Sequence, residues 1–299
     1  MAYRLVSIFL AALLGCSLAF ADDQADAPLP WNGKADKSTC PISSGAVWAD
    51  YHSGQDCIRY FAAGNIEHAP VAVIVFGGDR HRAARMKPEE IRDNTVRKQQ
   101  AIADRVARRL GLPVVIVARP GTYGSSGNHL RTRHIAEFLA LDAALDAIKD
   151  RYRIERFVVY GHSGGATAGA ALLTMGRTDI SCAVLTSGAF ALFERARILD
   201  EAKGRKPRDR ENNPRYADLY DPLDHVDGIV RDPTRKIFVI GNEKDQVTPF
   251  DLQKMFADKV RQEGHQVQLV THAAVGPAFH DLKDSIGLTT AASCARPGR

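Results

Sequence analysis

The chain has 299 residues, of which 45% are hydrophobic, and its formal net charge is +5. A chain of this length and composition can bury a full core, in one large α/β domain or in two small ones. Acidic and basic residues are interspersed along most of the sequence, without a long basic tract and without alternating aromatic and basic residues. The composition therefore gives little support to nucleic-acid binding.

Residues 1–21 have the features of a secretory signal peptide. Arg4 is followed by an apolar run from Leu5 to Gly15 and then by Ala19-Phe20-Ala21, an A-x-A cleavage site. The run is short for a membrane span. We therefore expect cleavage after Ala21, an exported protein, periplasmic or secreted, and no transmembrane span in the mature chain. An alternative is a lipobox ending at Cys16, with lipid attached there, although Leu14 fits that motif poorly.

Cleavage after Ala21 leaves four cysteines, Cys40, Cys57, Cys182 and Cys294. An even number of cysteines in an exported chain suggests disulfides. We favour Cys40–Cys57, which would close a small N-terminal loop, and Cys182–Cys294, which would tie the C-terminal tail to the rest of the fold. The other pairings stay open.

Short strands and helices alternate along the rest of the chain. Residues 22–45 are rich in Asp, Ala, Pro, Gly and Ser, show no period and are expected to form an extended leader. A β-hairpin is predicted over residues 46–62. Continuous apolar runs predict strands, and apolar residues at helical spacing predict helices. The strands are 71–76, 114–118, 157–160, 183–186, 236–240 and 267–271, and the helices are 94–110, 135–148, the segment after Ser163, 251–264 and a last short one at 280–286.

This alternation predicts an α/β fold with a doubly wound, mostly parallel sheet, in one domain over residues 46–299. Residues 189–233 interrupt the alternation, because they are charged and contain several prolines. They are expected to form a small cap or excursion over the sheet after the sixth strand, and we call them the cap segment. In such sheets ligands bind beyond the carboxyl ends of the strands, where the polar features of this chain fall.

Residues 156–169, with the sequence RFVVYGHSGGATAG, predict a strand, a sharp turn and a helix. Ser163 stands at the apex of the turn, in the G-x-S-x-G arrangement of a nucleophile elbow. The neighbouring glycines lack Cβ atoms, which lets the chain double back at a strained serine. The motif alone is weak, because a plain glycine-rich turn between a strand and a helix has the same sequence, so its context must support it.

A serine hydroxyl is a poor nucleophile at neutral pH and needs a base, which in turn needs an acid to orient it. In the order serine, acid, histidine, Asp245 follows the 236–240 strand and His280 follows the last strand. His280 is expected to accept the proton of Ser163, and Asp245 to hold the imidazole and stabilise its charged form. Two alternatives stay open, with His272 as the base or Glu243 as the acid.

Acyl transfer also needs donors for the developing oxyanion. The backbone N–H of Gly164, directly after the nucleophile and at a helix N-terminus, is one expected donor. Gly78, in the loop after the 71–76 strand, is the expected second donor, with Asp79 as the alternative. This chemistry requires neither a metal nor a cofactor, and we expect none.

Several motifs in this order resemble the α/β-hydrolase family, in its serine-nucleophile branch. The resemblance covers about residues 46–286 and includes the elbow at 161–165, a loop at 119–127 similar to D-x-P-G-x-G-x-S, and an acid loop at 241–249 similar to G-x-x-D-x-x-V-P. Residues 221–226, DPLDHV, resemble the dienelactone-hydrolase and prolyl-oligopeptidase-like members. The chain departs from the pattern at Arg119, where the family usually has Asp, and at Phe76, since the histidine common before the oxyanion-loop glycines is missing.

Two stretches near the predicted site are charged or aromatic. The basic residues Arg80, Arg82, Arg85 and Lys87 follow the oxyanion loop, where they could attract an anionic substrate, although a solvated loop is the simpler interpretation. The cap segment is expected to form the wall of the acyl pocket and begins with the apolar residues 190–193. Its middle is densely charged, which disfavours a triglyceride lipase.

The sequence therefore predicts an exported serine hydrolase that cleaves carboxylic esters of small molecules through an acyl-enzyme. The resemblance also includes peptidases, so the alternative is a serine peptidase or amidase that acts on short peptides. A third hypothesis is a catalytically silent α/β-hydrolase fold that serves as a binding module. The sequence leaves the oligomeric state open.

Overall fold

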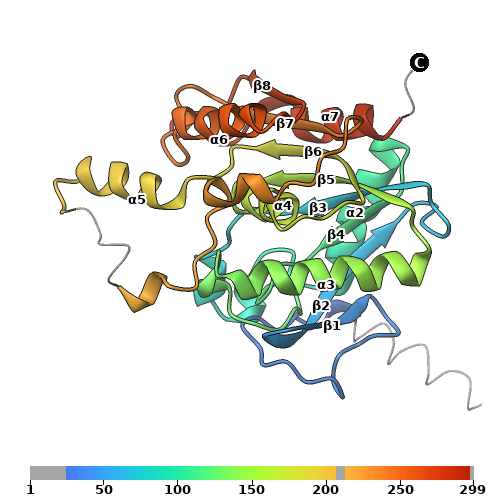
Figure 1. Ribbon diagram of the computed structural model, residues 1–299. Coiled ribbons are helices and arrows are strands. Elements are labelled where there is room, and N and C mark those ends of the chain that lie inside the picture. Colours follow the sequence, from blue (N-terminus) through green and yellow to red (C-terminus); the bar gives the residue numbers. More distant parts are fainter. Residues whose placement is uncertain (1–24, 207–212, 297–299) are drawn as a thin grey trace, which may run out of the picture.

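The computed structural model describes residues 25–206 and 213–296 (Figure 1). The predicted signal peptide and the alternative lipidation site at Cys16 lie outside these residues. One eight-stranded sheet has the order β1-β2-β4-β3-β5-β6-β7-β8. The strands are β1 (Ala46–Tyr51), β2 (Gly54–Ala63), β3 (Val71–Phe76), β4 (Val114–Val117), β5 (Arg156–His162), β6 (Ile180–Thr186), β7 (Lys236–Gly241) and β8 (Val267–Thr271).

The sheet is mostly parallel, as predicted. The hairpin β1–β2 is antiparallel and pairs with β4, also antiparallel, while β3 to β8 all run in the same direction. The strand β3 is buried on both faces of the sheet. Ala72, Ile74 and Phe76 belong to the core on one face, and Val73 belongs to the core on the other face. A strand with both faces covered is apolar at nearly every position.

Helices cover both faces of the sheet (Figure 1). The helices are α2 (Val96–Leu110), α3 (Ile135–Tyr152), α4 (Gly164–Thr174), α5 (Leu192–Glu201), α6 (Phe250–Gln262) and α7 (Ile286–Ala295). The helices α3, α4 and α6 lie on one face, and α2 and α7 lie on the other. The α/β class and the doubly wound arrangement are therefore confirmed.

The end of the chain differs from the prediction. The expected helix at 280–286 is wrong, because residues 280–285 form a loop with a short 3-10 turn, and Asp284 and Ser285 have positive φ angles of 59° and 51°. The helix begins instead at Ile286 and continues to Ala295. It packs against β3, β5 and β6, and a Cβ at Gly287 would collide with the ring of Tyr160, so this glycine lets the helix approach the sheet closely.

Both favoured disulfides are present. Cys40–Cys57 joins the segment before β1 to β2, and Cys182–Cys294 joins β6 to α7. The leader also packs on the domain, since the Trp31 indole N–H donates to the side-chain oxygen of Asn94 at 2.7 Å and the Leu29 N–H donates to the Asn94 carbonyl at 2.9 Å.

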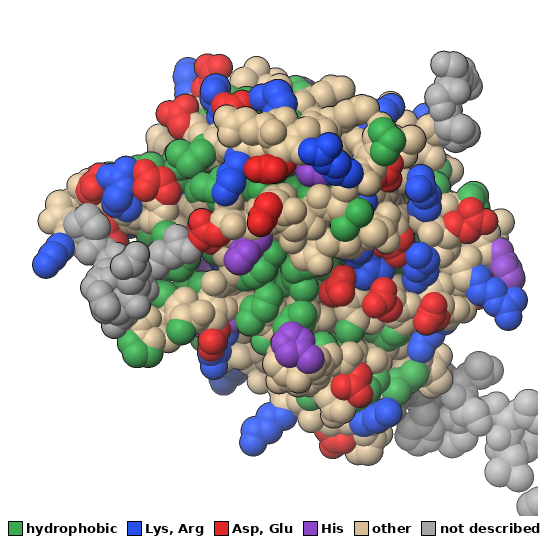
Figure 2. Space-filling model, viewed as in Figure 1, with side chains coloured by type: hydrophobic (Ala, Val, Ile, Leu, Met, Phe, Trp, Pro, Cys, Tyr) green, Lys and Arg blue, Asp and Glu red, His purple; other side chains and the backbone are tan. Residues whose placement is uncertain are grey.

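On the face shown in Figure 2, Lys and Arg side chains are mixed with Asp and Glu side chains. This mixing agrees with the interspersed charges of the sequence. Within residues 25–206 and 213–296, no helix is both long and apolar enough to cross a bilayer.

Candidate active site

The loops that carry the predicted site residues all follow parallel strands, so they meet at the carboxyl edge of the sheet. The strand β5 leads into Ser163, β7 into the Asp245 loop, β8 into the His280 loop, and β3 into Gly78. At this edge lies a pocket of about 520 Å³, lined by Gly78, Asp79, Arg80, His81, Arg133, His162, Ser163, Arg195, Val247, His280 and Asp281.

Ser163 occupies a strained turn between β5 and α4. Its φ is 54° and its ψ is −119°, a conformation that costs a non-glycine residue about 1–3 kcal/mol. The flanking glycines make the turn feasible, because a Cβ at Gly161 would collide with the Gly165 carbonyl and a Cβ at Gly165 would collide with the Phe76 carbonyl. The Ser163 N–H donates to the Thr186 carbonyl at 2.9 Å, which fixes the turn to β6.

His280 and Asp245 form a hydrogen-bonded pair. The Nδ1 of His280 lies 2.9 Å from Oδ2 of Asp245, and the Asp245 side chain is fully buried. The carboxylate also accepts from the N–H groups of Val247 and Thr248, at 2.8 Å and 2.9 Å, and from the Thr248 hydroxyl at 2.9 Å. Burial alone would raise the pKa of Asp245, but these hydrogen bonds outweigh it and the pKa lies below its ordinary value. Asp245 therefore stays ionised beside the imidazole.

Ser163 and His280 line the same pocket, although no hydrogen bond joins them in the described part of the chain. Such bonds are often long without substrate and shorten when it binds. The alternative residues lie elsewhere, since His272 and Glu243 line a separate pocket that contains none of Ser163, Asp245 and His280. His272 lies 3.7 Å from Asp284. The geometry thus favours His280 and Asp245 over these alternatives.

The two expected oxyanion donors lie near Ser163. A Cβ at Gly78 would lie 3.3 Å from the Ser163 Cβ, so the loop after β3 lies directly against the serine. Within the described residues, no protein acceptor takes the N–H of Gly78 or of Gly164. Asp79, the alternative donor, has its carboxylate next to Gly164, where a Cβ would collide with it. An anion so close to an oxyanion hole would oppose catalysis unless its charge were cancelled.

A buried ionic network cancels that charge, and sequence reasoning did not predict it. Arg119 is 2% exposed and donates to Asp79 at 2.9 Å and to Glu137 at 2.7 Å. Arg133 donates to the second oxygen of Asp79. Burial would raise the pKa of Asp79, but the charges and hydrogen bonds of Arg133 and Arg119 hold it well below its usual range. The signal in the sequence was Arg119 itself, which stands where the resembling family usually has Asp.

The cap segment contributes to the pocket in a different way from the prediction. Phe190 is fully buried and stacks on Phe256 with ring centroids 4.5 Å apart, so it belongs to the core. The pocket is instead lined by Arg195 of α5. The N-terminus of α5 is held by Asp221, whose carboxylate accepts from the Leu192 N–H at 2.7 Å.

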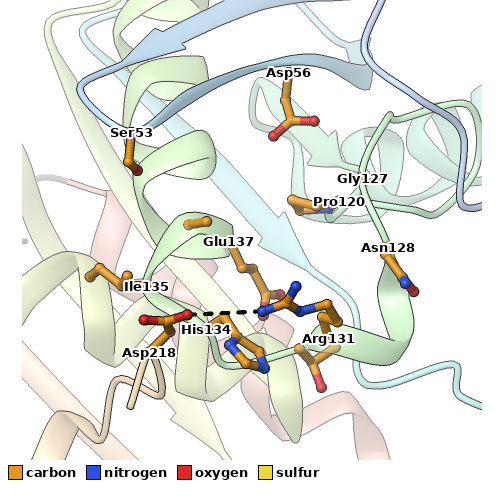
Figure 3. Close-up of a pocket in the computed structure, with 12 residues that line it drawn as sticks. Ser53, Asp56, Pro120, Gly127, Asn128, Arg131, His134, Ile135, Glu137 and Asp218 are labelled. Atoms are coloured by element: carbon orange, nitrogen blue, oxygen red, sulfur yellow. Dashed lines mark ion pairs between the residues drawn. The ribbon is translucent and has the colours of Figure 1, made fainter. Parts of the chain in front are cut away.

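A second pocket, of about 370 Å³, lies at the N-terminus of α3 and is shown in Figure 3. Arg131 and Asp218 face each other there, 3.9 Å apart. Its other carboxylates are already bound, since Asp56 accepts from the Ser126 hydroxyl at 2.5 Å and Glu137 accepts from Arg119. None of the predicted site residues lines this pocket, so it is a poor candidate for the active site.

No protein-family profile matches the chain, and no curated protein matches it. Among solved structures, an esterase from Pyrococcus furiosus superposes with a TM-score of 0.57 at 16% identity, covering 89% of this chain and 97% of the esterase. Est1E from Butyrivibrio proteoclasticus, with ferulic acid bound, gives a TM-score of 0.56 at 18% identity and covers 84% of this chain and 96% of Est1E.

An acylaminoacyl peptidase from Pyrococcus horikoshii is similar over a smaller part of its length. It gives a TM-score of 0.52 at 18% identity and covers 84% of this chain but only 39% of the peptidase. At these identities the likeness concerns the fold alone. Together with the strand order and the elbow at Ser163, it confirms the predicted architecture: the chain has the α/β-hydrolase fold.

Proposed function

We propose that this protein is an exported serine hydrolase that cleaves carboxylic esters of small molecules through an acyl-enzyme. The main supporting observation is that Ser163, in a strained elbow, shares one pocket with His280, whose other ring nitrogen is bound to the buried Asp245. A serine, an imidazole and a buried carboxylate in this order are the groups that acyl transfer requires.

The reaction follows from these positions. His280 takes the proton of Ser163 while the serine oxygen attacks the ester carbonyl, and Asp245 stabilises the imidazolium that forms. The N–H groups of Gly164 and Gly78 hold the oxyanion. His280 then gives its proton to the leaving alcohol, the acyl group stays on Ser163, and a water activated by His280 releases the acid.

The coverage of the structural neighbours favours ester substrates over peptides. The Pyrococcus furiosus esterase and Est1E match this chain over nearly their whole length, whereas most of the acylaminoacyl peptidase lies outside the match. The alternative of a serine peptidase or amidase keeps the same mechanism. Turnover of p-nitrophenyl acyl esters, compared with that of aminoacyl anilides, separates the two activities.

A fluorophosphonate probe tests the nucleophile directly. The wild type should be labelled, and Ser163→Ala should lose all labelling because the attacking oxygen is gone. His280→Gln should be labelled far more slowly, while the matched variant His272→Gln, in the neighbouring pocket, should be labelled at the wild-type rate. Labelling of Ser163→Ala at the wild-type rate would contradict the assignment of Ser163 as the nucleophile.

A further inference from the structure

The wall of the Ser163 pocket is richer in arginine than the triad chemistry requires. Arg80, Arg133 and Arg195 all line it. They come from three separate parts of the chain: the loop after β3, the turn before α3, and the cap helix α5. Arg80 is exposed at this position, while Arg133 and Arg195 are at least partly buried. Burying a guanidinium is costly unless an anion accompanies it.

Arg195 lacks such an anion. Its Nε donates to the Val247 carbonyl at 2.7 Å, which fixes the guanidinium against the acid loop. Within residues 25–206 and 213–296, no carboxylate lies within ion-pair distance of this side chain. Burial, and after it the positive charge of Arg133, lower the pKa of Arg195, and the more weakly acting negative charges of Asp79 and Asp245 do not reverse this.

Arg133 is only partly compensated. Its Nη2 binds Asp79 and its Nη1 donates to the Thr132 hydroxyl at 3.0 Å, but its buried Nε has no partner among the described residues. Its backbone has a φ of 69°, a conformation that a non-glycine residue adopts at a cost. The fold therefore tolerates backbone strain at Arg133, whose side chain lines the pocket.

The charged groups around the pocket are paired unevenly. Arg119, Arg133 and Arg195 carry three positive charges, and the buried carboxylates bound to this group, Asp79 and Glu137, carry two. Asp245 is engaged with His280, and Asp281, whose side chain is 80% exposed, is bound to His162. The Arg195 guanidinium thus lines a space of about 520 Å³ without a carboxylate bound to it among the described residues.

We propose that the substrate of this hydrolase is an anionic ester, one that carries a carboxylate besides the bond that is cleaved, and that Arg195 together with Arg133 binds this carboxylate. A guanidinium binds carboxylates through paired N–H groups, and such charge-assisted bonds are strong where water is partly excluded. The inference rests on the proposed esterase activity. It also gives the cap segment a function, because α5 supplies the specificity-determining residue.

Matched esters test the proposal, with the carboxylate on either side of the scissile bond. Monoethyl succinate and ethyl pentanoate compare an acidic with a neutral acyl part, and acetoxyacetate and propyl acetate compare an acidic with a neutral alcohol part. Turnover is followed by proton release. For the wild type, kcat/KM should favour the acidic member of at least one pair by tenfold or more, and which pair does so identifies the side that Arg195 faces.

Arg195→Met keeps the apolar stem of the side chain and removes its charge. It should lower the ratio of acidic to neutral kcat/KM by about 10- to 100-fold. Arg197→Met is the matched control, because Arg197 is on the same helix but its side chain is 45% exposed and bound to Glu194 and Glu201. It should leave the ratio unchanged. High salt should also reduce the wild-type ratio, since it screens the attraction.

A wild-type ratio near one for both pairs, or an equal fall in both variants, overturns the proposal. A binding measurement separates this failure from a failure of the esterase assignment. Calorimetry with Ser163→Ala should show binding of monoethyl succinate or of acetoxyacetate, weakened at least tenfold when Arg195→Met is added. If the wild type neither turns over esters nor reacts with the fluorophosphonate but this binding is present, the esterase assignment is wrong and the anion site is supported. If neither acidic ester binds, the anion site is wrong.

Discussion

The two sides of the Ser163 pocket hold their carboxylates by opposite means. On the acid side, Asp245 accepts from backbone N–H groups, from a hydroxyl and from His280, without an arginine. On the oxyanion side, Asp79 is held by the guanidiniums of Arg119 and Arg133. Neutral donors keep Asp245 ionised without neutralising it, so its negative charge can stabilise a positive imidazole. The charge of Asp79, in contrast, is neutralised by two cations.

This difference follows from what each carboxylate has next to it. Asp245 lies beside a ring that becomes positive during the proposed reaction, so an unneutralised negative charge there is useful. Asp79 lies beside Gly164, where the proposed reaction develops a negative charge. The comparison teaches that an acid near a catalytic site can have a purely structural role when its charge is fully paired.

The largest expected effect is a loss of activity from a substitution on the Asp245 side of the pocket. Asp245→Asn should lower kcat for ester hydrolysis by about 10⁴-fold, because an amide cannot hold the imidazole in the required tautomer or stabilise its charged form. KM should change little, since Asp245 does not touch the substrate. Steady-state kinetics checks this, with Glu243→Gln as the control that keeps wild-type rates. An Asp245→Asn variant within tenfold of the wild type would contradict the role of Asp245.

The next largest expected effect is a loss of stability from a substitution on the Asp79 side of the pocket. Arg119→Met leaves Asp79 and Glu137 buried with one partner fewer, which should lower the free energy of unfolding by about 3–5 kcal/mol. Urea unfolding followed by circular dichroism measures this loss. Arg197→Met, which removes two exposed ion pairs, should cost less than about 1 kcal/mol. Equal losses in the two variants would show that the buried ion pairs of Arg119 stabilise the fold no more than the exposed ion pairs of Arg197.

The smallest expected effect is a pH dependence that distinguishes Asp79. Burial opposes ionisation, but Arg133 and Arg119 prevail and the folded-state pKa of Asp79 lies well below its unfolded value of about 3.9. The stability that ionised Asp79 contributes is therefore present above about pH 4 and lost as the pH falls below it. The difference in unfolding free energy between wild type and Asp79→Asn should shrink by about 1 kcal/mol between about pH 6 and about pH 3.

Urea titrations of both proteins at each pH give this difference. Other carboxyl groups titrate in both proteins, so they cancel from the comparison. A difference that stays constant over the whole range would mean that Asp79 has an ordinary pKa in the folded protein.

The sequence allowed the sheet to be predicted closely because its strands are continuous apolar runs. The strands at 71–76 and 267–271 have the predicted bounds. The helix α7 was misplaced because its Gly287, two threonines and Ser293 are weak helix formers, and its position depends on packing against β5 and β6 and on the disulfide to Cys182. Long-range contacts of this kind leave no period in the sequence.

Only the site residues that belong to sequence motifs could be predicted. Ser163, Asp245 and His280 follow from the order of loops after strands, and their catalytic roles stay predictions for the tests above. The ionic network could not be predicted, because Asp79, Arg119 and Glu137 come from three distant segments and polar residues in loops have no pattern. Arg195 is a similar case, since only the fold brings α5 over the pocket.

The Cys182–Cys294 disulfide has a consequence for the base of the proposed reaction. Cys182 is near the start of β6, at the edge of the sheet opposite the pocket, while the loop that carries His280 ends where α7 begins. The bond closes a loop with a sequence separation of 112, which in a chain-entropy account stabilises a protein by about 4–5 kcal/mol. In a reducing medium, α7 would keep its packing on the sheet and hydrogen bonds at its two ends, such as that from Arg296 to the Leu110 carbonyl, but would lose this covalent link. We therefore expect the proposed activity to depend on the thiol–disulfide balance of the surroundings, although no cysteine lines the Ser163 pocket.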